Sequence, residues 1–109
     1  MTIVSVYATF ADAEEAERIG RQVLDERLAA CVNILGPCRS IYRWQGTVEH
    51  ADEIAAIFKT TAGKANGLVT RIADLHSYDL PAVAVWPIDK LSKGYGEWVE
   101  QSVETVEVS

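Results

Sequence analysis

Two histidines and two cysteines are the side chains of this sequence with the right chemistry for a transition metal. Copper and zinc prefer imidazole and thiolate ligands, and they usually take about three or four of them. The chain carries His50, His76, Cys31 and Cys38, and no pair among them has HxxH or CxxC spacing. The spacing is therefore only a weak indication of a metal motif.

The two cysteines lie on either side of Gly36-Pro37. On a regular strand, Cys31 and Cys38 would be about 23 Å apart and would face opposite sides. A disulfide would need the chain to turn at Gly36-Pro37. In a reducing compartment, free and packed thiols are the better prediction.

Catalytic motifs are harder to find. His76 with Tyr78 or Glu53 would supply acid–base chemistry if the fold brought these groups together. No serine lies in a GxSxG elbow, and neither GxxxxGK[ST] nor GxGxxG occurs in the sequence. We therefore expect a protein that is not an enzyme.

Composition excludes several other classes. The 109 residues suit a single domain, and 49% apolar with 24% charged residues is ordinary for a globular chain. A net charge of −6 disfavours binding to nucleic acid or to an anionic membrane. No apolar run approaches the roughly 18 residues that cross a bilayer, and the first ten residues lack the basic start of a signal peptide. We therefore expect a cytoplasmic protein.

Periodicity divides the first third of the chain into a strand, a helix and a strand. Residues 3–9 form a β-rich run, and Asp12 with Glu15 is a capping-box pattern that begins a helix. The helix is expected to run through about residue 29 because of an apolar stripe: Ala16, Ile19, Val23 and Leu28. A second strand is expected over residues 30–35, ending at Gly36-Pro37.

The last third follows the same kind of pattern. Thr60 or Thr61 can cap a helix whose apolar stripe is Leu68, Ile72 and Leu75. Residues 82–88 are continuously apolar, which predicts a buried strand. A short helix is expected over residues 94–103, and residues 104–109 are expected either to pair as a strand or to fray.

Between these parts lies a long hairpin, residues 40–61, with its turn at Gln45-Gly46. The run from Thr47 to Lys59 contains no proline or glycine, and fully extended it would span about 43 Å. A domain of this length is only about 34 Å across, so the hairpin should extend beyond it. Strands that extend in this way expose unpaired edges, which favours pairing with another copy of the chain.

The order β-α-β-β-α-β with a C-terminal addition is that of the ferredoxin-like fold, an α+β sandwich with an antiparallel sheet. In the third strand Ile54, Ala56 and Phe58 face one side, whereas Ala55 and Ile57 face the other. Apolar residues on both faces indicate that the second face is covered as well. A partner subunit is the simplest cover, since the chain has no further helices.

Five segments, in order and in register over residues 3 to 102, resemble the motifs of the divalent-cation tolerance (CutA) family. They are residues 26–33 (ERLAACVN), residues 40–46 (SIYRWQG), Glu53 with residues 59–61 (KTT), residues 76–81 (HSYDLP) and residues 95–98 (YGEW). The resemblance implies a ferredoxin-like subunit in a tightly packed homotrimer, similar in shape to the PII signalling proteins. It also implies a role in tolerance of divalent metals, with copper binding.

The family resemblance carries over only part of a copper site. In relatives, copper ligation involves a cysteine near the end of the first strand and two adjacent histidines. Here Ala8 stands at the first position, and Leu75-His76 replaces the histidine pair. The resemblance therefore leaves His76 as the candidate ligand for copper or another divalent cation, in one chain or in a site shared across a trimer interface.

The same motifs supply a set of polar and aromatic residues that form the candidate cleft: Tyr42, Trp44, Glu53, Lys59, His76, Tyr78, Tyr95 and Trp98. Aromatic side chains with polar tips suit both subunit interfaces and ligand pockets. One interpretation makes Trp44 an interface anchor, pairs Lys59 with Glu53 and packs Tyr78 and Trp98 in the core. The other places a ligand pocket at a subunit boundary.

We therefore expect a non-catalytic homotrimer that responds to metal ions and binds divalent cations weakly. The alternative is a PII-like signalling or scaffold trimer that binds a small effector or a protein partner at the clefts between subunits.

Overall fold

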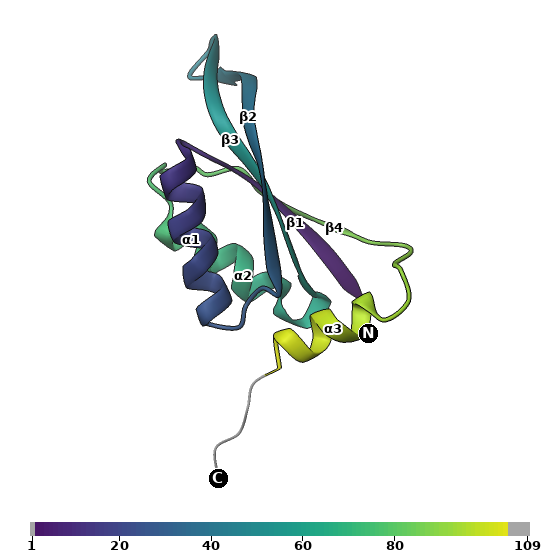
Figure 1. The fold of residues 1–109 in the computed structure, drawn as a ribbon. Coiled ribbons are helices and arrows are strands. Elements are labelled where there is room, and N and C mark those ends of the chain that lie inside the picture. Colours follow the sequence, from purple (N-terminus) through teal and green to yellow (C-terminus); the bar gives the residue numbers. More distant parts are fainter. Residues whose placement is uncertain (1, 105–109) are drawn as a thin grey trace.

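A computed structural model describes residues 2–104 of the chain (Figure 1). Its elements follow the order β1 (Ile3–Phe10), α1 (Ala13–Asp25), β2 (Cys31–Trp44), β3 (Thr47–Thr61), α2 (Ala62–Leu75), β4 (Val83–Pro87) and α3 (Tyr95–Ser102). The strand expected near the C-terminus falls mostly on residues 105–109, which lie outside the described residues.

The four strands form one antiparallel sheet in the order β2-β3-β1-β4. Helices α1 and α2 cover one face, as Figure 1 shows. Between that face and the helices lies the core, in which Val6, Phe10 and Phe58 pack with Ile19 and Leu68. The α+β ferredoxin-like prediction is confirmed. We call the opposite face, which carries Tyr7, Thr9 and Glu53, the outer face of the sheet.

Helix α1 ends at Asp25, four residues before the expected end at residue 29. Arg27 adopts a left-handed conformation with φ of 58°. The Leu28 amide donates to the Val23 carbonyl at 2.9 Å, and the Arg27 amide donates to the Leu24 carbonyl at 3.0 Å. This is a Schellman cap, and it keeps Leu28 against the core although the helix has ended.

Strand β2 runs through Gly36-Pro37, where we expected it to end. A bulge between Ile34 and Gly36 absorbs one residue, and Gly36 has a positive φ of 101°. Pro37 is tolerated because β2 is an edge strand. The bulge also overturns the expectation that the cysteines face opposite sides: Cys31 pairs with Lys59 and Cys38 with Glu53, so both lie on the outer face. Both thiols are free.

The β2–β3 hairpin extends past the helical layer, as expected (Figure 1). Its turn, Gln45-Gly46, has φ of 49° and 81°, so both central residues are left-handed, as in a two-residue hairpin turn. The molecule measures 52 × 32 × 22 Å, and its long dimension reflects the length of this arm.

Strand β4 is more exposed than its sequence predicts. Its continuous apolar sequence predicted burial, yet Val85 and Trp86 are 41% and 43% exposed. The reason is its place at the sheet edge beside β1 alone, with part of its surface on the uncovered outer face. No helix within residues 2–104 is long and apolar enough to span a membrane.

Candidate functional site

The outer face carries side chains from three strands at the end nearest the hairpin. Residues two apart on a strand share a face, so Ser40, Tyr42 and Trp44 of β2 lie beside Glu49 and Glu53 of β3. On β1, Tyr7 and Thr9 continue the same surface. The segment after α2 closes one side of it with Tyr78, Asp79, Leu80 and Ala82.

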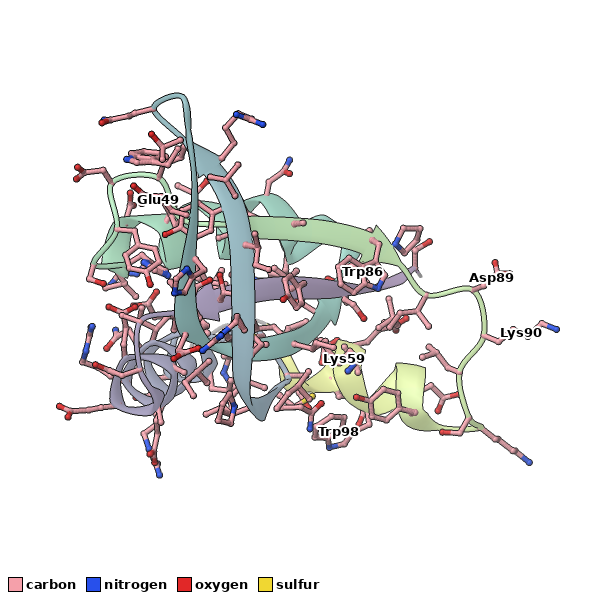
Figure 2. The ribbon with its side chains drawn as sticks, turned by 90° about the horizontal axis from the view of Figure 1, so that it is seen from above. Glu49, Lys59, Trp86, Asp89, Lys90 and Trp98 are labelled. Carbon is pink, nitrogen blue, oxygen red and sulfur yellow. The ribbon has the colours of Figure 1, made fainter. Side chains whose placement is uncertain are left out.

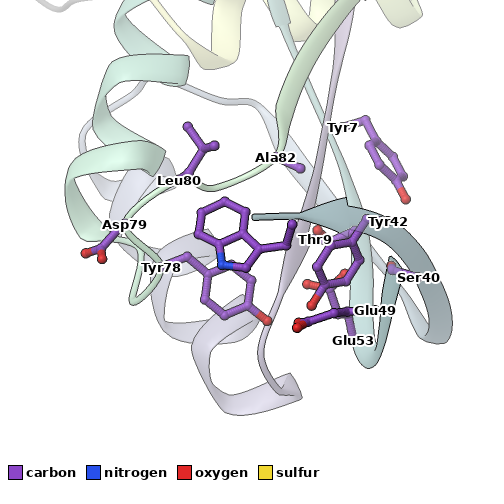
Figure 3. Close-up of a pocket in the computed structure, with 11 residues that line it drawn as sticks. Tyr7, Thr9, Ser40, Tyr42, Glu49, Glu53, Tyr78, Asp79, Leu80 and Ala82 are labelled. Carbon is purple, nitrogen blue, oxygen red and sulfur yellow. The ribbon is translucent and has the colours of Figure 1, made fainter. Parts of the chain in front are cut away.

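Together these residues line a cleft of about 590 Å³ (Figure 3). The lining residues are Tyr7, Thr9, Ser40, Tyr42, Trp44, Glu49, Glu53, Tyr78, Asp79, Leu80 and Ala82. Figure 3 shows Tyr42, Glu49, Glu53 and Tyr78 gathered in one part of the cleft, with Leu80 and Ala82 in another. The cleft thus combines aromatic rings with carboxylates, which gives it an apolar wall and a negative charge.

Glu53 is the most enclosed carboxylate of the cleft, with an exposed fraction of 8%. The Tyr78 hydroxyl donates a hydrogen bond to it. Burial, and after it the hydrogen bond and charge of Glu53, raises the pKa of Tyr78 to about 12. A phenol is protonated at neutral pH in any case, and the raised pKa extends the range in which Tyr78 is a hydrogen-bond donor to higher pH.

His76 lies behind the cleft rather than in it, at the end of α2. Its Nε2 is 2.8 Å from the carbonyl oxygen of Thr9, and its Nδ1 accepts the Tyr78 amide at 3.1 Å. The carbonyl can only accept, so Nε2 carries a proton and the ring is the neutral tautomer. The imidazole also stacks on Phe10, with centroids 5.1 Å apart. Both ring nitrogens are thus occupied by the protein.

Glu15 belongs to the same buried group, although its sequence pattern indicated only a helix cap. The side chain is 7% exposed, and its Oε1 is 3.6 Å from Nε2 of His76. It accepts hydrogen bonds from the amides of Ala11 and Ser77, each at 3.3 Å. Glu15 therefore ties the start of α1 to the segment that carries Tyr78.

Three of the predicted site residues lie at the other end of the outer face: Lys59 on β3, and Tyr95 and Trp98 on α3. Figure 2 shows Lys59 and Trp98 together there, away from Glu49. The Tyr95 and Trp98 rings stack with centroids 5.7 Å apart, and the Tyr95 hydroxyl is 3.5 Å from Sγ of Cys31. Burial, and then the contact with Cys31, raises the pKa of Tyr95 to about 12.

The expected ion pair between Lys59 and Glu53 does not form. Six residues of extended strand separate them by about 20 Å. The Lys59 ammonium instead approaches the Asn33 side-chain oxygen at 3.5 Å. The structure therefore brings together Tyr42, Trp44, Glu53 and Tyr78, with His76 behind them, and keeps Lys59, Tyr95 and Trp98 apart from this group.

Several residues that line the cleft are not among those predicted from the sequence, above all Glu49, Asp79 and Tyr7. Glu49 was detectable, because it lies four residues from Glu53 on the same face of one strand and opposite Tyr42 in a hairpin with a known turn. Tyr7 and Asp79 were not, since their position depends on how β1 and the segment after α2 pack against the hairpin.

Within residues 2–104, no three His, Cys, Asp or Glu side chains are arranged to hold a metal ion. In the arrangement described here, the cleft is suited to binding by charge and aromatic contact, whereas acid–base catalysis would need a free ring nitrogen on His76.

Several known proteins are similar to this chain in fold and in sequence. A CutA from Thermococcus kodakarensis, a divalent-cation tolerance protein, is 38% identical over 99 residues, which are 91% of this chain and 94% of the relative. The solved structure of the periplasmic divalent cation tolerance protein CutA from Archaeoglobus fulgidus has a TM-score of 0.90 and 37% identity, and the match covers 94% of this chain and 99% of that one. CutA1 from Oryza sativa has a TM-score of 0.91 and 32% identity, with 97% of each chain covered.

The profile of the CutA1 divalent ion tolerance protein family matches residues 4–102, which include both ends of the outer face. With this match and these relatives, the resemblance that five short motifs indicated extends over nearly the whole chain. The chain belongs to the CutA1 divalent ion tolerance protein family.

Proposed function

We propose that the protein acts in divalent-cation tolerance as a non-catalytic homotrimer assembled through its hairpin arm and the edge strand β4. The observation that carries this proposal is the set of large apolar side chains left exposed on these elements: Ile34, Leu35, Ile41, Tyr42, Trp44, Val48, Val85 and Trp86. An apolar surface of this kind on a soluble monomer usually marks an interaction site.

Backbone pairing supports the same proposal. Strands β2 and β4 are the two edges of the sheet, and each leaves a row of amide and carbonyl groups without a strand partner in one chain. The arm is long enough to reach the edge of a neighbouring copy. Three copies that pair arm to edge in a closed ring would satisfy these groups and cover the outer face.

The role of His76 supports a function without catalysis. A general base needs a free nitrogen, and both nitrogens of His76 are engaged with Thr9 and Tyr78. The cysteines offer no nucleophile with a base beside it, since Cys31 contacts Tyr95 and Cys38 lies near Ser40. These free thiols fit a reducing compartment, which favours a cytoplasmic location.

For divalent cations, we propose weak binding by carboxylates of the cleft rather than by His76 in its present contacts. Glu49, Glu53 and Asp79 supply the oxygen atoms, and a second chain would complete the ligand set. The alternative of a PII-like trimer that binds an effector or a protein partner has only the cleft in its favour.

Native mass spectrometry before and after copper(II) tests both parts of this proposal. We expect a trimer that gains a fixed number of copper ions per three chains, and we expect His50→Ala to leave that number unchanged. A trimer that gains no copper would contradict the metal part. A monomer at micromolar concentration would contradict the assembly, which is the basis of the whole proposal.

A further inference from the structure

Glu15 of α1 is a buried carboxylate whose contacts go beyond those of a helix cap. Its side chain is 7% exposed. In a capping box, a glutamate at this position would accept the amide of the N-cap residue, Asp12. Instead, Oε1 accepts the Ala11 amide and Oε2 accepts the Ser77 amide, each at 3.3 Å. One of its two oxygens therefore binds a segment 62 residues further along the chain.

Residues 76–82, between α2 and β4, are all described by the structure and form neither helix nor strand. The first three of them pass from the core to the outer face. His76 stacks on Phe10 of the core, with centroids 5.1 Å apart. The Tyr78 hydroxyl donates to Glu53 on the outer face. The positions of these residues therefore depend on side-chain contacts rather than on the hydrogen bonds of a regular element.

Glu15 fixes this passage in two ways. Directly, it accepts the Ser77 amide. Indirectly, it acts on His76, because its Oε1 is 3.6 Å from Nε2 and its negative charge favours a proton there. Nε2 donates that proton to the Thr9 carbonyl at 2.8 Å, which leaves Nδ1 to accept the Tyr78 amide at 3.1 Å. Two neighbouring amides of the segment thus depend on one carboxylate.

The charge of Glu15 also acts on Tyr78. After burial and the contact with Glu53, it is a further cause that raises the pKa of Tyr78 to about 12. The His76 ring connects the two residues, since it lies 3.6 Å from Oε1 of Glu15 and its centroid is 4.7 Å from that of the Tyr78 ring. Backbone contacts and charge therefore both join the start of α1 to Tyr78.

We propose that Glu15 is a positioning residue for the outer face: from the helix side of the sheet, it fixes residues 76–78 and thereby the position of Tyr78. Asp79 follows directly, so the same anchor positions a carboxylate that we propose as a cation ligand. The link to cations rests on the proposed function, whereas the position of Tyr78 does not. Neither needs an open cleft, since a neighbouring copy that covers the outer face would contact the same two side chains.

Hydrogen exchange of backbone amides in the full-length ¹⁵N-labelled protein tests the anchor. Glu15→Ala removes both acceptor oxygens, so the Ser77 and Tyr78 amides should exchange at least about tenfold faster, with little change in β1. The matched control is Glu14→Ala, which removes the same charge from an exposed position in the same turn of α1. Both variants lose the same interaction with the helix dipole, so Glu14→Ala should leave exchange at Ser77 and Tyr78 within about twofold.

Ser77→Pro removes the same contact from the other side and decides the question if Glu15→Ala does not fold. It deletes the amide that Glu15 accepts, and His76 has φ of −73° and ψ of 146°, a conformation that suits the residue before proline. The Tyr78 amide should again exchange faster. Ser77→Ala keeps the amide, so this control should leave exchange at Tyr78 unchanged.

Copper(II) titration of the same variants, followed by native mass spectrometry, tests the link to cations. Glu15 is not one of the proposed ligands, yet Glu15→Ala should weaken copper binding about tenfold, because residues that orient ligands commonly have effects of this size. Glu14→Ala should stay within about twofold of the wild type.

Equal exchange at Tyr78 in Glu15→Ala and Glu14→Ala would overturn the proposal, because Glu15 would then be only a helix cap. Equal acceleration at Tyr78 and throughout β1 would do the same, since it would indicate a loss of stability in the whole chain. A wild-type trimer that gains no copper refutes the proposed function and leaves the exchange result intact. Faster exchange at Tyr78 with unchanged copper affinity refutes only the link to Asp79.

Discussion

The two ends of the outer face carry similar residues and yet differ in structure. At the hairpin end, Tyr42, Trp44 and Tyr78 surround Glu53 and leave a cleft. At the other end, α3 lies over the sheet, and its rings are packed on each other and on Cys31. What differs is the covering element, not the residue types. Aromatic motif residues thus form a cavity only where no helix of the same chain fills the space.

The largest effect is expected from removing His76, whose side chain contacts Thr9, Tyr78 and Phe10 behind the cleft. His76→Ala should lower the free energy of unfolding by about 3 kcal/mol. The change removes the ring that stacks on Phe10 and leaves the Thr9 carbonyl and the Tyr78 amide without their partner. Urea denaturation measures it.

His50→Ala is the matched control for that prediction. His50 is exposed on the hairpin, and its loss should change stability by about 0.5 kcal/mol or less. If His76→Ala were as stable as the wild type but had lost a copper site, His76 would be a ligand rather than a support, and the hairpin end would be a metal centre.

The second prediction contrasts one tryptophan from each end. Trp44 and Trp98 are similarly exposed, at 41% and 46%. Trp44→Ala should weaken assembly by about 2 kcal/mol, because buried aromatic anchors dominate interfaces. Trp98→Ala should instead lower the stability of the chain by about 1 kcal/mol through the lost stack with Tyr95.

Sedimentation velocity over a dilution series and thermal melting distinguish these two outcomes. Only the Trp44 variant should dissociate at higher concentration than the wild type. If the two variants dissociated alike, assembly would use the α3 end as much as the hairpin, and the difference between the ends would lose its functional meaning.

The smallest effect concerns Tyr78 and Tyr95, whose pKa values are both raised to about 12, first by burial and then by different neighbours: Glu53 for Tyr78 and Cys31 for Tyr95. In the folded state each phenol holds its proton more tightly than at its usual value of about 10. Each therefore stabilises the fold below pH 10 and loses that contribution as the pH rises through about 12.

Absorbance titration of the tyrosines in the alkaline range, with Tyr78→Phe and Tyr95→Phe to assign them, separates the causes. Glu53→Gln should move only the Tyr78 titration towards lower pH, and Cys31→Ala only that of Tyr95. A single change that moved both would mean that the two ends are electrostatically coupled.

Local patterns were sufficient to predict the order of the elements, the hairpin turn and the α+β class. The N-cap at Asp12 and the Gln45-Gly46 turn each depend on a few neighbouring residues, so the sequence predicts them directly. The predicted end of α1 was wrong because Leu28 packs against the core from the Schellman cap that follows the helix, not from the helix itself. The predicted burial of β4 was wrong because apolar composition does not reveal which strand lies at an edge of the sheet.

The candidate cleft was predictable only in part. The motifs place four residues in one candidate cleft, and the structure brings them together: Tyr42, Trp44, Glu53 and Tyr78. The motifs also include Lys59, Tyr95 and Trp98, but a motif gives no distances between its residues. Strand β3 is 15 residues long, so side chains at its two ends lie far apart. Glu15 was missed because its role depends on His76, far along the chain.

The bulge between Ile34 and Gly36 shifts the register of β2 against β3 by one residue and so decides which side chains of the arm lie on the outer face. Beyond it, even-numbered residues of β2 share a face with odd-numbered residues of β3, so Tyr42 lies opposite Glu49, and Trp44 and Glu53 lie on the same face. Deleting one residue at the bulge would restore the other phase and turn the aromatic side of the arm inside out. The length of β2 to the residue is therefore as much a part of the cleft as any side chain in it, and relatives aligned with a one-residue gap there would present the opposite surface.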